Sequence, residues 1–126
     1  MKETNKNQLV RSNQIEWQPL SEDGVTGIYV KSLQFDAKTQ RSPTFLLKFE
    51  AGAKYPLHNH PEGEEIFVLE GDIHLGKDHL FAGDYLFTAP NNLHAARTDN
   101  GCTLLFKVPQ EVEIIEKRNN GLTGKI

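Results

Sequence analysis

Three histidines and a group of glutamates are the residues best suited to chemistry in this chain. His58 and His60 are separated by one residue, and residues two apart in an extended segment project from the same face. Pro61 and Gly63 then break the strand, so the chain can turn and bring a carboxylate back toward the same point. His94 follows a second turn and opens a later strand. Two or three imidazoles with one carboxylate suit a divalent transition metal and leave one or two coordination positions open.

Three carboxylates compete for the fourth ligand position, namely Glu62, Glu64 and Glu65. Strand alternation places two aliphatic residues on the same face as Glu64, which fits a face turned toward a core. The same alternation places Phe67 and Leu69 on the face of Glu65, which fits a core equally well. Parity alone therefore does not decide between them.

Other residues near these clusters have simpler interpretations. His74 and His79 flank a turn and could form a cross-strand pair, and we interpret them as exposed hairpin histidines rather than metal ligands. Cys102 lies in an apolar run and is expected to be a buried small hydrophobe rather than a reactive thiol. Three residues are close in sequence to the candidate ligands and could line a pocket: Tyr55, Phe87 and Arg97.

The elements that must position these side chains are short apolar runs separated by Gly, Pro, Asn or Asp. No segment of twelve residues free of Gly and Pro has a convincing helical period. Residues 110–117 form the best helical candidate, although this segment could equally be a last strand. Many short strands with turn signals between them predict an all-β sandwich or barrel. The expected strands are 27–35, 44–49, 65–69, 73–75, 79–81, 85–88 and 102–108.

Turn residues predict how these strands connect. Residues 76–78 are expected to form a three-residue hairpin loop, and residues 70–72 and 82–84 to form tight turns. We expect a flexible N-terminal segment over 1–13, one barrel over 14–116 and a flexible tail over 117–126.

Length and composition limit the classes of function. The chain has 126 residues, which suits one domain, and its net charge of −3 provides no basic stripe for nucleic acid. No apolar run is long enough to cross a bilayer, and the first residues lack the apolar stretch of a secretory signal. One cysteine excludes an internal disulfide. We therefore expect a cytoplasmic domain without nucleic-acid or membrane partners.

The spacing of the first cluster resembles a known sequence motif. From Gly52 to Gly71 the chain reads Gly-x5-His-x-His-x3-Glu-x6-Gly, which is similar to the first motif of the cupin superfamily. Counting along this motif favours Glu64 as the carboxylate. From Gly83 to His94 a glycine, a proline and a histidine follow in the order of the second cupin motif, with a loop before His94 that is one residue shorter than usual.

The resemblance implies both a fold and a ligand set. It implies a single-domain cupin, a double-stranded β-helix of jelly-roll type, with His58, His60, Glu64 and His94 around one divalent metal such as zinc, iron, manganese or nickel. The run from His58 to Gly71 is most similar to the anti-sigma-factor (ChrR-type) zinc cupins and the acetylacetone-dioxygenase-like proteins. Residues 88–90 depart from that subgroup because Thr-Ala-Pro replaces its usual Arg-Asn-Pro.

Two classes of function follow from this resemblance. The first is a non-haem dioxygenase-type or related enzyme that acts on a small oxygen-rich substrate. The second is a non-catalytic zinc-binding sensor or regulatory module. Cupins of this kind commonly pair through N-terminal arms, and Ile15 and Trp17 would share one strand face, so we expect a homodimer with Trp17 near its interface.

Overall fold

The structure is a computed structural model that describes residues 6–115. Within that range the chain forms ten strands and one turn of 3-10 helix at Ser12–Gln14, and it contains no α-helix. The strands are β1 (Gln18–Pro19), β2 (Ile28–Asp36), β3 (Arg41–Phe49), β4 (Lys54–Asn59), β5 (Glu64–Leu75), β6 (Asp78–Phe81), β7 (Tyr85–Thr88), β8 (His94–Arg97), β9 (Cys102–Lys107) and β10 (Glu113–Ile114).

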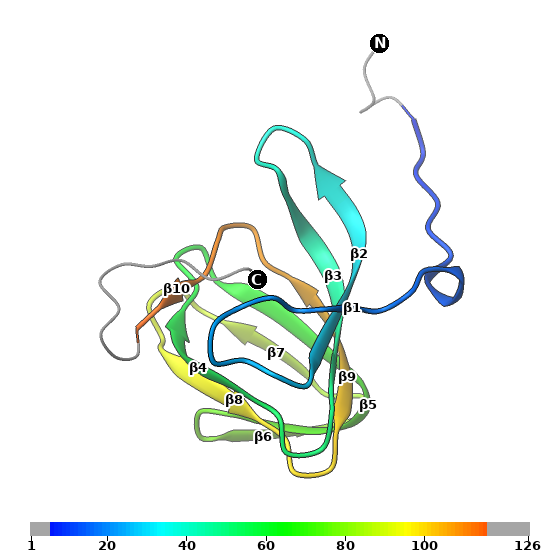
Figure 1. The fold of residues 1–126 in the computed structure, drawn as a ribbon. Helices are drawn as coiled ribbons and strands as arrows, with labels where there is room; N and C mark the ends of the chain where they lie inside the picture. Colours follow the sequence, from blue (N-terminus) through cyan, green and yellow to red (C-terminus); the bar gives the residue numbers. More distant parts are fainter. Residues whose placement is uncertain (1–5, 116–126) are drawn as a thin grey trace.

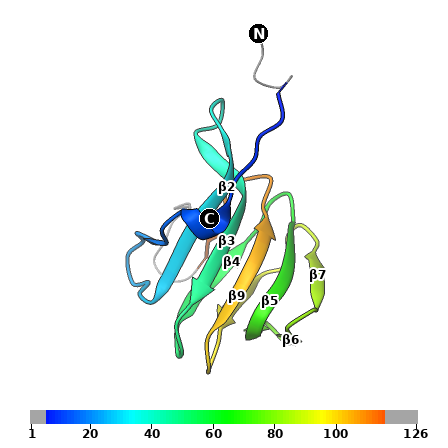
Figure 2. The same cartoon turned by 90° about the vertical axis from the view of Figure 1, so that its right-hand side faces the viewer.

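All strand pairs are antiparallel, and they form two sheets that share β5. The first sheet has the order β1-β2-β3-β9-β5-β7, and its long strands lie side by side in Figure 2. The second sheet contains β10-β4-β8-β5, with β6 on the other side of β5. The two sheets curl around one core, while the β2–β3 hairpin extends beyond the barrel (Figure 1). The all-β barrel expected from the sequence is confirmed.

Strand β5 corrects one prediction. Residues 70–72 are not a tight turn between two strands, because the chain continues as one strand from Glu64 to Leu75. Gly71 has a φ of 76°, and the pairing with β9 shifts register between Val68 and Glu70. This kink turns the strand from the first sheet into the second without ending it, which is a known role of glycine in barrels.

The core lies between the two sheets, and strand alternation explains which residues enter it. In β9 every second residue is buried, and in β3 the buried residues are 45–47 and Phe49. The rings of Phe45 and Phe106 stack across these strands with centroids 5.3 Å apart. Ile66 and Val68 of β5 are also buried, whereas Phe67 and Leu69 face outward. Removal of the buried core side chains from water is the main favourable contribution to folding.

Several other expected elements can be compared with the structure. Asp78 pairs with Leu75, so the hairpin loop contains two residues rather than three. The turn over 82–84 is present, closed by a hydrogen bond from the Asp84 amide to the carbonyl of Phe81. Residues 110–115 contain a strand rather than a helix, and residues 116 and 117 of that candidate lie outside the described residues, as do 1–5 and the tail over 117–126.

Two further observations concern the surface. No helix in residues 6–115 is long and apolar enough to span a membrane. Trp17 is half-buried, and the ammonium groups of Lys31 and Lys48 lie 4.7 and 5.1 Å from the centre of its ring. The ring therefore packs against β2 and β3 of its own chain through cation–π contacts.

Candidate metal centre

Three strands and one tight turn bring the candidate ligands together. His58 lies near the end of β4 and His94 begins β8, and these two residues are register partners across the β4–β8 pair. His60 follows β4, and Glu64 begins β5 after a turn that is closed by a hydrogen bond from the Gly63 amide to the His60 carbonyl. Gly63 has a φ of 82°, and a Cβ atom there would lie 2.8 Å from the Thr88 carbonyl oxygen. Glycine thus allows the turn that brings Glu64 back toward the histidines.

The four side chains, hereafter the His–Glu cluster (His58, His60, Glu64, His94), are all buried. One ring nitrogen from each histidine lies within 4.8 Å of the other two. Glu64 adds two short contacts, from Oε1 to His60 Nε2 at 2.8 Å and from Oε2 to His94 Nε2 at 3.1 Å. The residues predicted from sequence spacing are therefore adjacent in space.

Several polar atoms of the cluster have no hydrogen-bond partner. His60 Nδ1, His60 Nε2, His94 Nε2 and Glu64 Oε1 are fully buried and make no hydrogen bond. The Nε2–Oε1 contact of 2.8 Å between His60 and Glu64 is thus close without the alignment of an N–H···O bond. Buried polar atoms without partners are rare and costly in folded proteins. Three imidazoles and a carboxylate whose free atoms gather in this way fit a divalent transition metal.

Neighbouring groups hold the ligands in place. His58 Nδ1 lies 2.7 Å from the carbonyl oxygen of Pro56, an arrangement that leaves Nε2 for a metal. The Thr88 hydroxyl donates to Glu64 Oε2 at 3.3 Å. The ring of Tyr55 meets that of His58 edge to face with centroids 5.0 Å apart, and its hydroxyl donates to the carboxylate of Glu22.

The electrostatics of the cluster favour the ligand forms of His58 and Glu64. Burial lowers the pKa of His58 to about 3, with help from the neighbouring His60 and His94, so this imidazole is neutral at ordinary pH. Burial alone would raise the pKa of Glu64, but His60 and His94 outweigh it and lower the pKa to about 2. Neutral imidazoles and an ionised carboxylate are the forms that bind metal.

The three competing glutamates differ in burial. Glu64 is 1% exposed, whereas Glu62 and Glu65 are exposed on the surface. The Tyr85 hydroxyl donates to Glu65 Oε1 at 2.9 Å on the outer face of the barrel. Of the three, only Glu64 contacts the histidines.

The other singled-out residues divide between the interior and the surface. Tyr55 is buried beside His58, but Phe87 and Arg97 are 54% exposed and do not line the interior. Cys102 is buried as expected, and burial raises the pKa of its thiol to about 12. His74 and His79 form the cross-strand pair that the sequence suggested.

Sequence reasoning missed several residues that support the cluster. Thr88 is the register partner of Glu64, and its place just before the Pro90 turn of the second motif could have identified it. Asn59 donates to Glu113 of β10 and to Asn91 of the loop before His94. No local sequence signal could have linked these segments, because they are distant along the chain.

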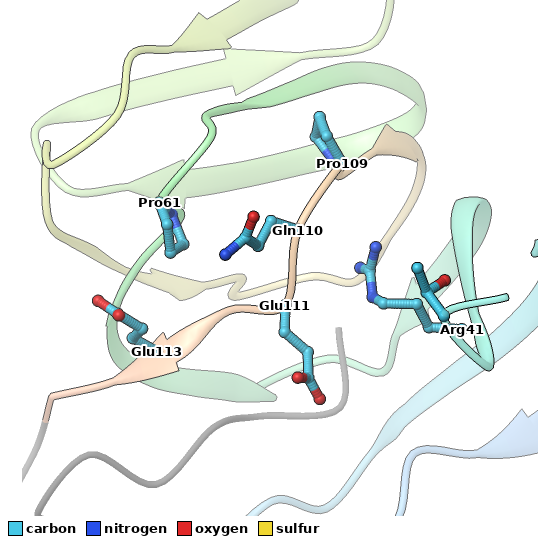
Figure 3. A pocket seen from close by; sticks show the side chains of 7 residues that line it. Arg41, Pro61, Pro109, Gln110, Glu111 and Glu113 are labelled. Atoms are coloured by element: carbon cyan, nitrogen blue, oxygen red, sulfur yellow. The ribbon is translucent and has the colours of Figure 1, made fainter.

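A hollow of about 290 Å³ lies at the surface next to the turn that follows His60. Figure 3 shows the Gln110 side chain projecting toward Pro61 within it. None of the four cluster residues lines this hollow. Its lining consists of Thr39, Arg41, Pro61, Pro109, Gln110, Glu111 and Glu113.

Comparison with known protein families shows which family this chain resembles. The sequence pattern of the family described as the ChrR Cupin-like domain matches residues 5–111. The chain belongs to this family. Comparison with curated proteins gives no match for this cupin domain.

Solved structures confirm the fold of this cupin domain. A candidate acetylacetone dioxygenase from Methylibium petroleiphilum PM1 has a TM-score of 0.84 at 19% identity, covering 97% of this chain and 90% of its own. An acetylacetone dioxygenase from Acinetobacter johnsonii has a TM-score of 0.77 at 18% identity, covering 98% and 89%. The Rhodobacter sphaeroides complex of SigE with the anti-sigma ChrR has a TM-score of 0.60 at 22% identity, covering 78% of this chain and 50% of the other.

Proposed function

We propose that this cupin domain binds one divalent transition metal through His58, His60, Glu64 and His94. The observation that supports this most strongly is the group of buried nitrogen and oxygen atoms that lie close together without hydrogen bonds. Three neutral imidazoles and one carboxylate leave a net charge of +1 on a bound divalent ion, and they suit iron, zinc, manganese or nickel.

We further propose that the metal serves a dioxygenase-type reaction on a small oxygen-rich molecule. The bound metal would supply Lewis acidity and, if it is redox-active, a place for oxygen or a chelating enolate. The chain itself would keep the ligands buried, exclude water and hold His58 through the Pro56 carbonyl. The acetylacetone dioxygenases with the same fold, which align over nearly the whole chain, support this choice.

A zinc-binding sensor or regulatory module is the alternative. The family match to the ChrR cupin-like domain supports it. Among the described residues beside the cluster, the hydroxyl groups of Tyr55 and Thr88 are already engaged as donors to carboxylates. Burial raises the pKa of Tyr55, so this phenol does not act as a base. A site whose described neighbouring hydroxyl groups do not act as a base suits a module that only holds its metal.

Oxygen consumption tests the choice between these functions. Protein prepared without metal is loaded with Fe²⁺ under argon and then mixed with oxygenated buffer and acetylacetone or a related β-diketone. We expect oxygen uptake that depends on the diketone and is lost in Glu64→Gln but kept in Glu65→Gln. Tight zinc retention with no diketone-dependent oxygen uptake by the iron form would favour the sensor.

A further inference from the structure

A second group of metal-binding side chains lies on the outside of the barrel. Asp72 and His74 are two residues apart on β5, and His79 of β6 is the register partner of His74. Their side chains project from the face opposite to Ile73 and Leu75, which are buried in the core. We call these three residues the hairpin cluster (Asp72, His74, His79). One ligand atom from each lies within 4.8 Å of the others.

The imidazoles of this cluster are held by their neighbours. His79 Nε2 lies 2.6 Å from Asp72 Oδ2. The rings of His74 and His79 stack with centroids 3.8 Å apart and planes 21° apart. Phe81 lies against the ring of His79 with a centroid distance of 4.3 Å. The ring of His79 therefore has an aromatic neighbour on its own strand and another across the hairpin, which limits its motion.

A second carboxylate lies at the edge of the cluster. Asp99 Oδ2 is 3.9 Å from His74 Nε2, while Asp99 Oδ1 accepts a hydrogen bond from Arg97 Nη1 at 3.1 Å. Both residues are exposed, so the carboxylate can turn toward the histidines if the guanidinium releases it. Asp99 would thus provide a fourth ligand from the segment that joins β8 to β9.

We propose that Asp72, His74 and His79 form a second divalent-metal site, completed by Asp99. Two imidazoles and two carboxylates suit zinc, and also nickel or copper. Bonds of about 2.0 Å in a tetrahedron place ligand atoms about 3.3 Å apart, so small side-chain rotations close the site. The metal replaces the direct contact between His79 and Asp72, and the buried residues of β5 separate it from the His–Glu cluster.

Zinc titration of the chelator-treated protein tests this site. Calorimetry and elemental analysis after desalting are expected to give two zinc ions per wild-type chain and one in the double variant His74→Ala/His79→Ala. The single variant His79→Gln keeps a side chain of similar length. It is expected to lower the zinc affinity of the hairpin cluster at least tenfold. Lys77→Ala in the hairpin loop is the matched control and should keep both ions.

The ion pair between Arg97 and Asp99 allows a test in which two substitutions should change the zinc affinity in opposite directions. Arg97→Ala frees Asp99 and is expected to raise the zinc affinity of the hairpin cluster a few-fold. Asp99→Asn is expected to lower that affinity. A double variant that binds as many zinc ions as wild type would overturn the proposal. Wild-type protein with one zinc ion, lost only in His74→Ala/His79→Ala, would support the hairpin cluster and contradict the function proposed for the His–Glu cluster.

Discussion

His58 and His94 are register partners on adjacent antiparallel strands, and their imidazole rings meet edge to face with centroids 4.7 Å apart. The turn after β4 adds His60, and the start of β5 adds Glu64. Ligands from such distant parts of the chain come together only when the barrel closes. Metal binding should therefore be coupled to folding.

Removal of the metal should lower thermal stability. A metal present at about a thousand times its dissociation constant stabilises the fold by about 4 kcal/mol, which for this length corresponds to about 10–20 °C in Tm. Calorimetry of the His74→Ala/His79→Ala variant with and without a chelator isolates the interior site. Equal melting temperatures for the two samples would contradict metal binding there.

Substitution of the proposed ligands should remove the interior metal selectively. His58→Ala, His60→Ala and His94→Ala should each reduce metal affinity at least tenfold, because each deletes a bond to the metal. Glu64→Gln should have a similar effect, while Glu65→Gln is its matched control, because Glu65 faces outward and contacts Tyr85. Elemental analysis at one equivalent of metal measures the difference. Equal losses from the two glutamine variants would show that Glu64 is not a ligand.

Acid should destabilise the metal-free protein in two stages. The pKa of His58 is about 3 when folded against an ordinary value of 6.5, so the unfolded state binds more protons between these values and stability falls as the pH drops below about 6.5. The pKa of Glu64 is lowered to about 2 from 4.5, which adds a second loss below about 4.5. Urea unfolding between pH 7 and 3 should reveal a decrease of a few kcal/mol. A profile that is flat from pH 6.5 to 4.5 would exclude the shift of His58, and one that is flat below 4.5 would exclude the shift of Glu64.

Gly71→Ala should be strongly destabilising. A Cβ atom there would lie 2.1 Å from the Gly101 carbonyl oxygen, so the backbone must move, and we expect a loss of about 3 kcal/mol or more in unfolding free energy. Gly24→Ala is a close control, because Gly24 has the same φ of 76° but no atom within 4 Å of an added Cβ. It should lose only about 1 kcal/mol through backbone strain. Similar losses in both variants would mean that strain, rather than close packing, determines the requirement for glycine.

Homodimer formation stays a prediction. Light scattering at tens of micromolar should give twice the chain mass, whereas a monomer mass would contradict it. Trp17 packs against Lys31 and Lys48 of its own barrel. Trp17→Ala therefore tests whether this residue of the N-terminal segment also contributes to the dimer interface. A dimer unaffected by this substitution would mean that the interface lies elsewhere.

The sequence predicted the parts of this molecule that depend on local pattern. The spacing of His58 and His60 indicated that they share a face, because strand parity is a local property. The choice of Glu64 among three glutamates came from the resemblance to the first cupin motif, since parity left that choice open. The tight turn predicted over residues 70–72 was wrong. A glycine that kinks a continuous strand cannot be distinguished, from the sequence alone, from a glycine that ends a strand. Thr88 and Asn59 could not be assigned roles, because these depend on which strands become neighbours.

The central position of β9 has a consequence for synthesis of the protein. This strand lies between β3 and β5, yet it follows both in the sequence. While the ribosome makes the chain, β3 and β5 have exposed, unpaired edges until residues 102–107 emerge. The barrel therefore cannot close during translation of its first four-fifths. Pairing of this kind, between segments far apart in sequence, makes folding slow and leaves the nascent chain exposed to aggregation until the end.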